Sequence, residues 1–294
     1  MLNATTIRIE PIGAALGADV HGVDLSVPVS DDAFAIIAGA WRDHLVLRFR
    51  GQQLSDENLL AFSRRFGPLD KAPINPYGTT WVPENPEINV ISNITTPEGQ
   101  RTGGLGDGEA EWHADMTYTD APPKGCMLYA LEVPLSGGDT GFDNMFAAYE
   151  ALPAATRERI ATLSCKHDAS RNSVGQLRKG FEENYKDVSE VPGAVHPLVR
   201  VHPETGGKAL YLGRRRNAYV MGLAVEESEA LLDELWAHIT KPEFNWHQQW
   251  QVGDLILWDN RFLLHRRDAF DPKARRHMRR TQIGETEPVL GIQS

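Results

Sequence analysis

The chain has 294 residues, with 30 Lys and Arg against 40 Asp and Glu, and a formal net charge of −10. This length can bury one sizeable core, so we expect a single domain over residues 1–294. The sequence contains no long basic tract of the kind that binds nucleic acid. It also contains no signal-like leader and no apolar run long enough to cross a membrane. We therefore expect the protein to bind neither nucleic acid nor a membrane.

The number and spacing of the cysteines favour a cytoplasmic protein. The two cysteines, Cys126 and Cys165, do not form a CxxC motif and are too few for a disulfide framework. We therefore expect both to be reduced, buried side chains of a cytoplasmic protein.

The N-terminal part predicts strands and helices in alternation. Residues 5–12 read as a strand and residues 13–27 as a glycine-punctuated loop. A helix follows with Ser30 as its N-cap, and residues 45–49 form the next strand. A second helix begins near Ser55 and ends at a Gly-Pro pair.

Two long irregular segments interrupt the remaining elements. Residues 70–108 are rich in Pro, Asn, Thr and Gly, with a strand-like island at 88–91. Residues 168–194 carry many charges and little periodicity. Long irregular segments in a compact domain are more often functional than idle, so we expect both to be active-site loops.

The C-terminal half predicts further short strands and one amphipathic helix. Apolar positions at helical spacing mark the helix around Leu232 to Ile239. The expected strands are residues 126–133, 197–202, 209–212 and 254–259. Many short strands with a few peripheral helices predict a mainly β fold with a jelly-roll core, also called a double-stranded β-helix.

A candidate metal site begins at Trp112-His113-Ala114-Asp115. On a strand, residues two apart share a face, so His113 and Asp115 can reach one ion. A second, distant His would complete a facial triad of the kind found in non-haem Fe(II) oxygenases. A His-x-Asp pair is common by chance, and His202-Pro203-Glu204 offers similar ligands. Its proline places that second pair at a hairpin turn, which favours a structural role.

Further motifs surround the first pair in a fixed order. They are WHAD at 112–115, PLSGGDT at 134–140, HPLVRVHPETGGKALYL at 196–212, AHITKPEF at 237–244, and WDNR at 258–261 followed by His265. A basic stretch at 275–280 comes next. From about residue 8 to 285 the chain resembles the taurine dioxygenase and 2,4-dichlorophenoxyacetate dioxygenase (TauD/TfdA) family of Fe(II)- and 2-oxoglutarate-dependent dioxygenases.

The resemblance implies roles for five residues at the reaction centre. His113, Asp115 and His265 would bind Fe(II). Thr140 would contact the carboxylate of the co-substrate 2-oxoglutarate, and Arg276 would bind its distal carboxylate. A guanidinium suits this last role, because it is planar, bidentate and charged even when buried.

The resemblance also indicates which residues would contact the primary substrate. Arg280 falls where the family presents an arginine to an anionic group of the substrate. Glu109 replaces an asparagine of the taurine enzyme, and Arg214, Arg215 and Arg216 replace an uncharged pocket segment, which argues against taurine itself. We expect one or more of these three arginines to help Arg280 bind the anionic substrate. Glu109 would pair with one of them or accept a hydrogen bond from a hydroxyl or amine of the substrate. Neighbours on an extended segment point to opposite faces, so we expect at least one of these three arginines to be solvated.

The implied activity is hydroxylation of a small organic anion with 2-oxoglutarate and O2, releasing succinate and CO2. A sulfonate, a sulfate ester or an aryloxy-carboxylate would fit, and the family suggests a dimer or tetramer. A halogenase of the same fold would lack the carboxylate ligand. The non-enzymatic alternative is a jelly-roll protein that binds metal for structure or sensing, but such sites normally supply four protein ligands.

Overall fold

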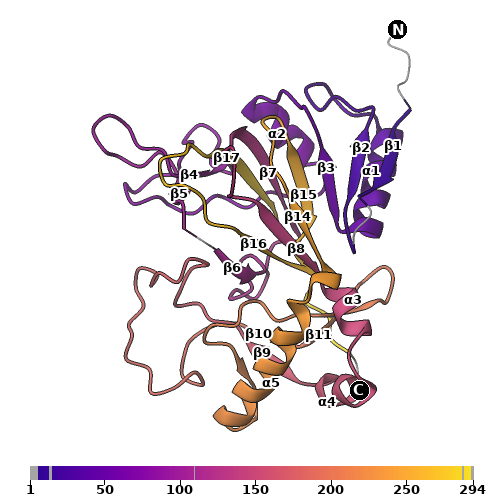
Figure 1. The fold of residues 1–294 in the computed structure, drawn as a ribbon, viewed down its shortest axis with the longest axis vertical. Coiled ribbons are helices and arrows are strands. Elements are labelled where there is room, and N and C mark those ends of the chain that lie inside the picture. The colour runs from indigo at the N-terminus through magenta and orange to yellow at the C-terminus, as the bar shows by residue number, and fades with distance from the viewer. Residues whose placement is uncertain (1–5, 13–14, 109, 287, 293–294) are drawn as a thin grey trace.

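The computed structural model describes residues 6–12, 15–108, 110–286 and 288–292. Within these ranges the chain forms two large sheets, two small sheets and five α-helices (Figure 1). None of these helices has the length and apolar character needed to span a bilayer.

The larger sheet has eight strands. Their spatial order is β1 (Arg8–Pro11), β2 (Ala18–His21), β3 (Val46–Phe49), β15 (Leu255–Asp259), β7 (Gly125–Glu132), β17 (His277–Ile283), β4 (Asn89–Ser92) and β5 (Gly104–Leu105). Pairing is antiparallel except between β2 and β3 and between β4 and β5. The central strands β15, β7 and β17 are thus separated in sequence and brought together by the fold.

The second large sheet carries much of the candidate site. Its order is β14 (Asn245–Gln248), β8 (Thr140–Asn144), β16 (Leu263–Arg267) and β6 (Ala110–His113), all antiparallel. The small sheets are β10 (Val195–Pro197), β9 (Ser164–Lys166) and β13 (Tyr219–Val220), and β11 (Val199–Val201) with β12 (Lys208–Leu210).

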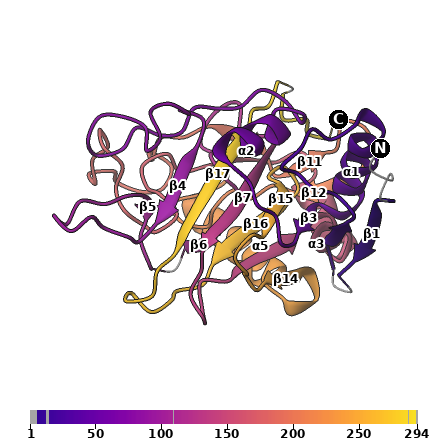
Figure 2. The same ribbon diagram turned by 90° about the horizontal axis from the view of Figure 1, so that it is seen from above.

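Both faces of the central strands of the eight-stranded sheet are buried. Leu128 of β7 and Ile256 of β15 belong to the core shared with the four-stranded sheet. Their neighbours Met127 and Leu257 point the other way, into a core formed with helices α1 (Asp31–His44) and α2 (Asp56–Ser63). Figure 2 shows α2 lying over β17 and β7. Alternate side chains of a strand point to opposite faces, which explains the unbroken apolar runs in β7 and β15.

The first two helices begin where their capping residues predict. The Ser30 side chain accepts a hydrogen bond from the backbone N–H of Ala33. Ser55 forms a capping box with Asn58, in which each side chain accepts from the other residue's backbone N–H. Such caps satisfy N–H groups that have no partner within the helix.

The other helices gather at the end of the molecule opposite the N-terminal strands (Figure 1). They are α3 (Met145–Glu150), α4 (Ala154–Ile160), α5 (Val225–Ile239) and the 3-10 turn η1 (Pro242–Phe244). The two irregular segments at 70–108 and 168–194 emerge on the left of the view, beyond β4, β5 and β6. A mainly β fold with peripheral helices is therefore confirmed.

Several local predictions are wrong. The segment 13–27 was expected to be a loop, yet it contains β2, whose Ala18 and Val20 are buried on alternate positions. Strands β8, β16 and β17 and helices α3 and α4 were not expected. The three strands carry polar residues that face inward, which hides the apolar alternation of a typical strand.

Asp143 of β8 is a buried acid with an unusual environment. It is fully buried, and neither carboxylate oxygen has a hydrogen-bond partner among the described residues. Burial raises the pKa of Asp143 to about 8, a rise that the positive charge of Arg266 opposes only in part. The folded carboxyl therefore keeps a proton that the unfolded chain releases above about pH 4.

We predict that the stability contributed by protonated Asp143 falls as pH rises from about 4 to about 8. A raised folded-state pKa stabilises fully below the unfolded pKa, and this stabilisation is lost as pH passes the folded value. Urea unfolding of the metal-free wild type and Asp143→Asn, compared across this range, measures the effect. The wild type should lose stability relative to the variant with rising pH, and parallel pH profiles would contradict the assignment.

Candidate metal centre and adjoining cavities

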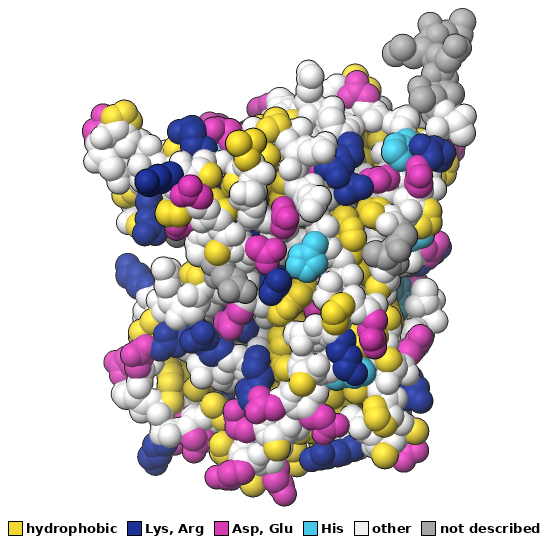
Figure 3. All heavy atoms as spheres, viewed as in Figure 1, with side chains coloured by type: hydrophobic (Ala, Val, Ile, Leu, Met, Phe, Trp, Pro, Cys, Tyr) yellow, Lys and Arg dark blue, Asp and Glu magenta, His cyan; other side chains and the backbone are white. Residues whose placement is uncertain are grey.

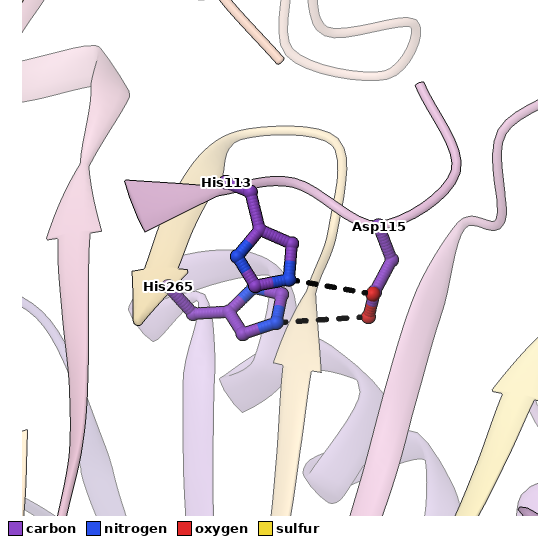
Figure 4. A group of neighbouring side chains, drawn as sticks. All are labelled: His113, Asp115 and His265. Atoms are coloured by element: carbon purple, nitrogen blue, oxygen red, sulfur yellow. Dashed lines mark ion pairs between the residues drawn. The ribbon is translucent and has the colours of Figure 1, made fainter. Parts of the chain in front are cut away.

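Three buried side chains from separate positions in the chain converge at one point (Figure 4). His113 ends β6 and is the direct cross-strand partner of His265 on β16. Their Nε2 atoms each lie 3.7 Å from one oxygen of Asp115, Oδ1 for His113 and Oδ2 for His265. Two metal–ligand bonds of about 2.1 Å span separations up to roughly 4.2 Å, so one ion can bridge these atoms.

Asp115 does not lie on a strand, contrary to the sequence prediction. Strand β6 ends at His113, and Asp115 stands in the turn that follows. Asn260 fixes this turn, because its Oδ1 accepts from the backbone N–H of Asp115 at 2.7 Å and its Nδ2 donates to the Asp115 carbonyl at 2.9 Å. The same amide nitrogen donates to the Pro123 carbonyl. These hydrogen bonds fix the turn and thereby the position of the Asp115 carboxylate.

The histidines are set up to bind a metal as neutral rings. Nδ1 of His113 donates to the backbone carbonyl of Glu111 at 2.7 Å, which leaves Nε2 with its lone pair toward Asp115. Burial and the neighbouring His265 hold the pKa of His113 well below its ordinary value. Burial likewise lowers the pKa of His265 to about 4, although Asp115 opposes the shift. Both rings are therefore unprotonated at neutral pH.

Asp115 is ionised despite its burial. Burial raises its pKa, but the positive charge of Arg280 and the two histidines outweigh this and hold the pKa well below its usual range. Nη1 of Arg280 donates to both carboxylate oxygens at 3.3 Å, and the Cys126 thiol donates at 3.4 Å. Two neutral imidazoles and one carboxylate form a facial donor set that suits Fe(II).

A pocket beside this centre is lined by Thr140 and Arg276. Gly137 and Gly138 lead into β8 with φ of 74° and 70°, and Gly137 lies so close to Ala269 that a Cβ would meet its carbonyl at 2.7 Å. This tight turn sets Thr140 on the first position of β8. The Thr140 hydroxyl accepts from Trp250 Nε1 at 3.0 Å, so its own hydrogen can be donated elsewhere.

Arg276 places a buried positive charge in the same pocket. It is 2% exposed, and its Nε has no hydrogen-bond partner among the described residues. Burial lowers its pKa to about 9, and the nearby Arg267 adds to the shift. Asp139 attracts the guanidinium but forms no ion pair with it among the described residues. A buried guanidinium without an ion-paired acid is costly, so the pocket fits a carboxylate. The residues lining it include His113, His265, Leu128, Trp258, Arg267 and Arg280.

A larger cavity of about 570 Å³ also borders the metal centre. Its walls include His113, Asp115, Arg280 and Arg214, together with residues of both irregular segments. The apolar or aromatic members are Pro73, Ile74, Pro76, Leu105, Met116 and Tyr118. On the left of the space-filling view, where the two irregular segments emerge in Figure 1, Lys and Arg side chains lie among acidic ones (Figure 3).

The three consecutive arginines point in different directions. Arg214 is buried and lines the cavity, with its Nε 3.8 Å from Glu111. Arg215 instead pairs with Glu229 and Asp233 of α5, away from the cavity. Arg216 is 46% exposed and lies 3.4 Å from Glu111. The expectation that at least one of the three is solvated agrees with this geometry.

The two remaining candidates are Glu109, predicted on the substrate side, and His202, the alternative metal ligand. Glu109 lies outside the described residues. Nδ1 of His202 accepts from the backbone N–H groups of Glu204 and Thr205 at 3.1 and 3.3 Å, which gives that His a turn-forming role.

Some residues at the site were not predicted. Asn260 holds the turn that carries Asp115, Trp250 donates to Thr140, and Arg267 lines the pocket beside the metal centre. Arg178 and Lys179 line the larger cavity. Asn260 belongs to the WDNR motif, and a polar residue directly after a buried strand is a signal that could have identified it as a site residue. Arg178 and Lys179 had none, because they lie within a generally charged segment.

Comparison with known proteins gives a consistent picture. A sequence profile of the family described as "Taurine catabolism dioxygenase TauD, TfdA family" matches residues 8–282. An (S)-phenoxypropionate/alpha-ketoglutarate-dioxygenase of Sphingobium herbicidovorans is 35% identical, covering 94% of both chains. An alpha-ketoglutarate-dependent 2,4-dichlorophenoxyacetate dioxygenase of Cupriavidus pinatubonensis is also 35% identical, covering 94% of this chain and 96% of that one.

Solved structures agree with the sequence relatives. The crystal structure of AAD-2 in complex with Mn(II) and N-oxalylglycine superposes with a TM-score of 0.78 at 31% identity. It covers 97% of this chain and 100% of that chain. The expected jelly-roll core is thereby confirmed.

We predict that His113→Ala, Asp115→Ala and His265→Ala each weaken Fe(II) or Co(II) binding by roughly 100-fold or more. A three-ligand site cannot spare a ligand, and supporting residues alone are worth about 10–100-fold in metal affinity. Anaerobic calorimetric titration measures the change. His202→Ala is the matched control and should bind like wild type, while unaltered affinity in any of the three variants would remove that residue from the ligand set.

Proposed function

The chain belongs to the TauD/TfdA family of dioxygenases, and we propose that it hydroxylates a small organic anion. It is a 2-oxoglutarate-dependent dioxygenase that uses Fe(II), with 2-oxoglutarate and O2 as co-substrates. Succinate and CO2 are its co-products. The family assignment sets aside the non-enzymatic sensor, and the carboxylate in the proposed ligand set sets aside the halogenase.

One observation supports this function above the others. The His113, Asp115 and His265 donor atoms lie within 4.8 Å of one another, and the pocket beside them holds the buried charge of Arg276. An open metal site next to a carboxylate site is the arrangement that a chelating keto-acid requires. We therefore propose these three side chains as the iron ligands.

We propose that Thr140 and Arg276 hold 2-oxoglutarate. The Thr140 hydroxyl accepts from Trp250 and can donate its hydrogen to a carboxylate oxygen. The guanidinium of Arg276 would bind the distal carboxylate, which supplies the negative charge that the buried side chain lacks. Leu128 and Trp258 line the same pocket, and their apolar surfaces strengthen these contacts by excluding water.

When bound, the iron supplies the oxidising chemistry, in which 2-oxoglutarate is decarboxylated and a substrate C–H bond is hydroxylated. The protein's part is to hold the reactants in register. The clamp of Asn260 on the Asp115 turn keeps the carboxylate ligand in place. Arg280 keeps that carboxylate ionised and borders both cavities, so it can also meet an anionic substrate.

The larger cavity supports an anionic substrate with an apolar body. Arg280 and Arg214 give it positive charge, and Pro73, Ile74 and Met116 give it apolar walls. An aryloxy-carboxylate, a sulfate ester or a sulfonate has this combination. Of the three consecutive arginines we retain Arg214 as a substrate contact.

Arg215 and Arg216 do not line the cavity, so they are not kept as substrate contacts. Glu109, which precedes the metal turn in the sequence, remains part of the proposal. Segments 70–108 and 168–194 both supply residues to the cavity wall, which supports a role as active-site loops. We also propose that residues 1–294 act as one domain in a dimer or tetramer. Two free, buried cysteines support a cytoplasmic location.

Succinate release tests the proposed function directly. The purified Fe(II) enzyme is supplied with 2-oxoglutarate, O2 and one of phenoxypropionate, 2,4-dichlorophenoxyacetate, octyl sulfate or taurine. We expect succinate formation coupled to loss of at least one of the first three compounds, and little or none with taurine. Failure of every anion to stimulate succinate release above the substrate-free rate would overturn the proposed substrate class.

The second prediction here concerns the co-substrate. Arg276→Ala should raise the apparent KM for 2-oxoglutarate at least about 30-fold, because losing a desolvated charge pair costs about 2–5 kcal/mol. Arg275→Ala is the matched control, since Arg275 is exposed and pairs with Glu132. An unaltered 2-oxoglutarate KM in Arg276→Ala would move the carboxylate site to another arginine, with Arg267 the next to test.

A further inference from the structure

Arg267 places a second buried guanidinium in the pocket beside the metal centre. It follows His265 by two positions on β16 and is the direct cross-strand partner of Thr140 on β8. Residues two apart on a strand, and direct partners on neighbouring strands, share one face of a sheet. The side chain of Arg267 therefore lies on the same face as these two, and it lines the pocket together with Arg276. None of the described residues that line this pocket is acidic.

Two nitrogens of this guanidinium are without a partner. Arg267 is 6% exposed, and neither Nε nor Nη1 has a hydrogen-bond partner among the described residues. Asp107 attracts the charge, but the two residues form no ion pair in the described part of the chain. The positive charge of Arg267 also lowers the pKa of Arg276, in addition to the larger effect of burial. Two like charges in one buried pocket repel each other, so an anion bound there stabilises both.

The third nitrogen of Arg267 holds a neighbouring segment of the chain. Nη2 donates to the backbone carbonyl of Leu105 at 3.0 Å and also to that of Gly108. Leu105 has a φ of 68°, a left-handed conformation that is unfavourable for a residue with a Cβ. Such a conformation persists only where neighbouring groups hold it. Arg267 is one of these groups, and the pairing of Leu105 with Ser92 supplies another.

Leu105 forms a wall that the two cavities share. It lines the pocket that contains Arg276, and it also lines the larger cavity of about 570 Å³. Residues 104–105 form β5, which is the edge strand of the eight-stranded sheet and pairs only with β4. Few strand contacts therefore hold this segment. The hydrogen bond from Arg267 to Leu105 is thus a physical connection between the two cavities.

We propose that Arg267 links the binding of 2-oxoglutarate to the wall of the substrate cavity, because Nε or Nη1 binds the distal carboxylate of the co-substrate while Nη2 holds Leu105. The inference rests on the proposed function, in which Arg276 binds the same carboxylate. The guanidinium is rigid and planar, so a carboxylate that holds one of its nitrogens also restricts the nitrogen that holds Leu105. Binding of 2-oxoglutarate then stabilises the segment 104–108. Such a coupling is reciprocal, so a firmly held segment also favours 2-oxoglutarate.

Hydrogen–deuterium exchange measures this link without turnover. The protein is loaded with Mn(II), and amide exchange is compared with and without saturating 2-oxoglutarate in two segments. Residues 104–108 report on the segment that Arg267 holds, and residues 137–144 report on the co-substrate pocket itself. Calorimetry on the same samples gives the Kd for 2-oxoglutarate. Wild type, Arg267→Gln and Arg267→Lys are compared with the matched control Arg275→Gln, whose arginine is exposed and pairs with Glu132.

In the wild type we expect 2-oxoglutarate to slow exchange in both segments at least about fivefold, the lower end of typical coupling between sites. Arg267→Gln should raise the Kd for 2-oxoglutarate about tenfold, the loss typical of one charge-assisted hydrogen bond. At saturation this variant should keep the slowing in 137–144 and lose it in 104–108. Arg267→Lys keeps the charge but lacks the planar group, so it should recover most of the affinity and only part of the slowing in 104–108. Arg275→Gln should match wild type.

Failure of this link is distinguishable from failure of the proposed function. Slowing of exchange in 137–144 but not in 104–108 of the wild type would overturn the link and leave the proposed function intact. An unaltered Kd for 2-oxoglutarate in Arg267→Gln would also overturn it, and faster exchange in 104–108 of that variant would then mark a purely structural role. A raised Kd with unaltered slowing in 104–108 would show that the carboxylate does not act on the segment. If the wild type does not bind 2-oxoglutarate, the proposed function fails and the link fails with it.

Discussion

The reaction centre depends on the pairing of β6 with β16. In this register His113 and His265 are direct partners, although they lie far apart in the sequence. A slip of one residue would turn His265 to the opposite face of the sheet. The same strand pairs with β8 on its other side, where Arg267 is opposite Thr140. One strand register therefore positions both the two histidines proposed as metal ligands and a wall of the pocket proposed for 2-oxoglutarate.

Positive charge without an ion-paired acid among the described residues is the second feature that links the fold to the proposed function. Arg276 is buried and attracted by Asp139 but forms no ion pair there, while Arg178 and Arg214 both donate to the Arg171 carbonyl beside the larger cavity. Buried or crowded cations destabilise a folded chain. In the proposed function the anions that neutralise them are the reactants, so the fold would provide part of the binding energy in advance. An acidic protein can thus concentrate anions in a local cleft.

The sequence predicted the chemistry better than the strands that carry it. His113, Asp115 and His265 stand in ordered motifs, and capping serines marked α1 and α2. Strands β8, β16 and β17 were not predicted, because polar side chains that point inward, toward the candidate site, break their apolar alternation. Whether Arg214 or Arg215 faces the cavity depends on the register of a short extended segment, which local sequence does not encode. That Arg178 lines the larger cavity could not be predicted, because its contact with Tyr118 joins distant parts of the chain.

The central claim is that the three-ligand centre and the Arg276 pocket act together as one site for iron and 2-oxoglutarate. Anaerobic titration of the Fe(II)-loaded protein with 2-oxoglutarate, followed by visible absorption, tests this most directly. We expect a new absorption band that saturates at one 2-oxoglutarate per chain, as chelation by the keto-acid alters the metal's environment. An Fe(II)-loaded protein that binds 2-oxoglutarate with no spectral response, or does not bind it, would contradict the account.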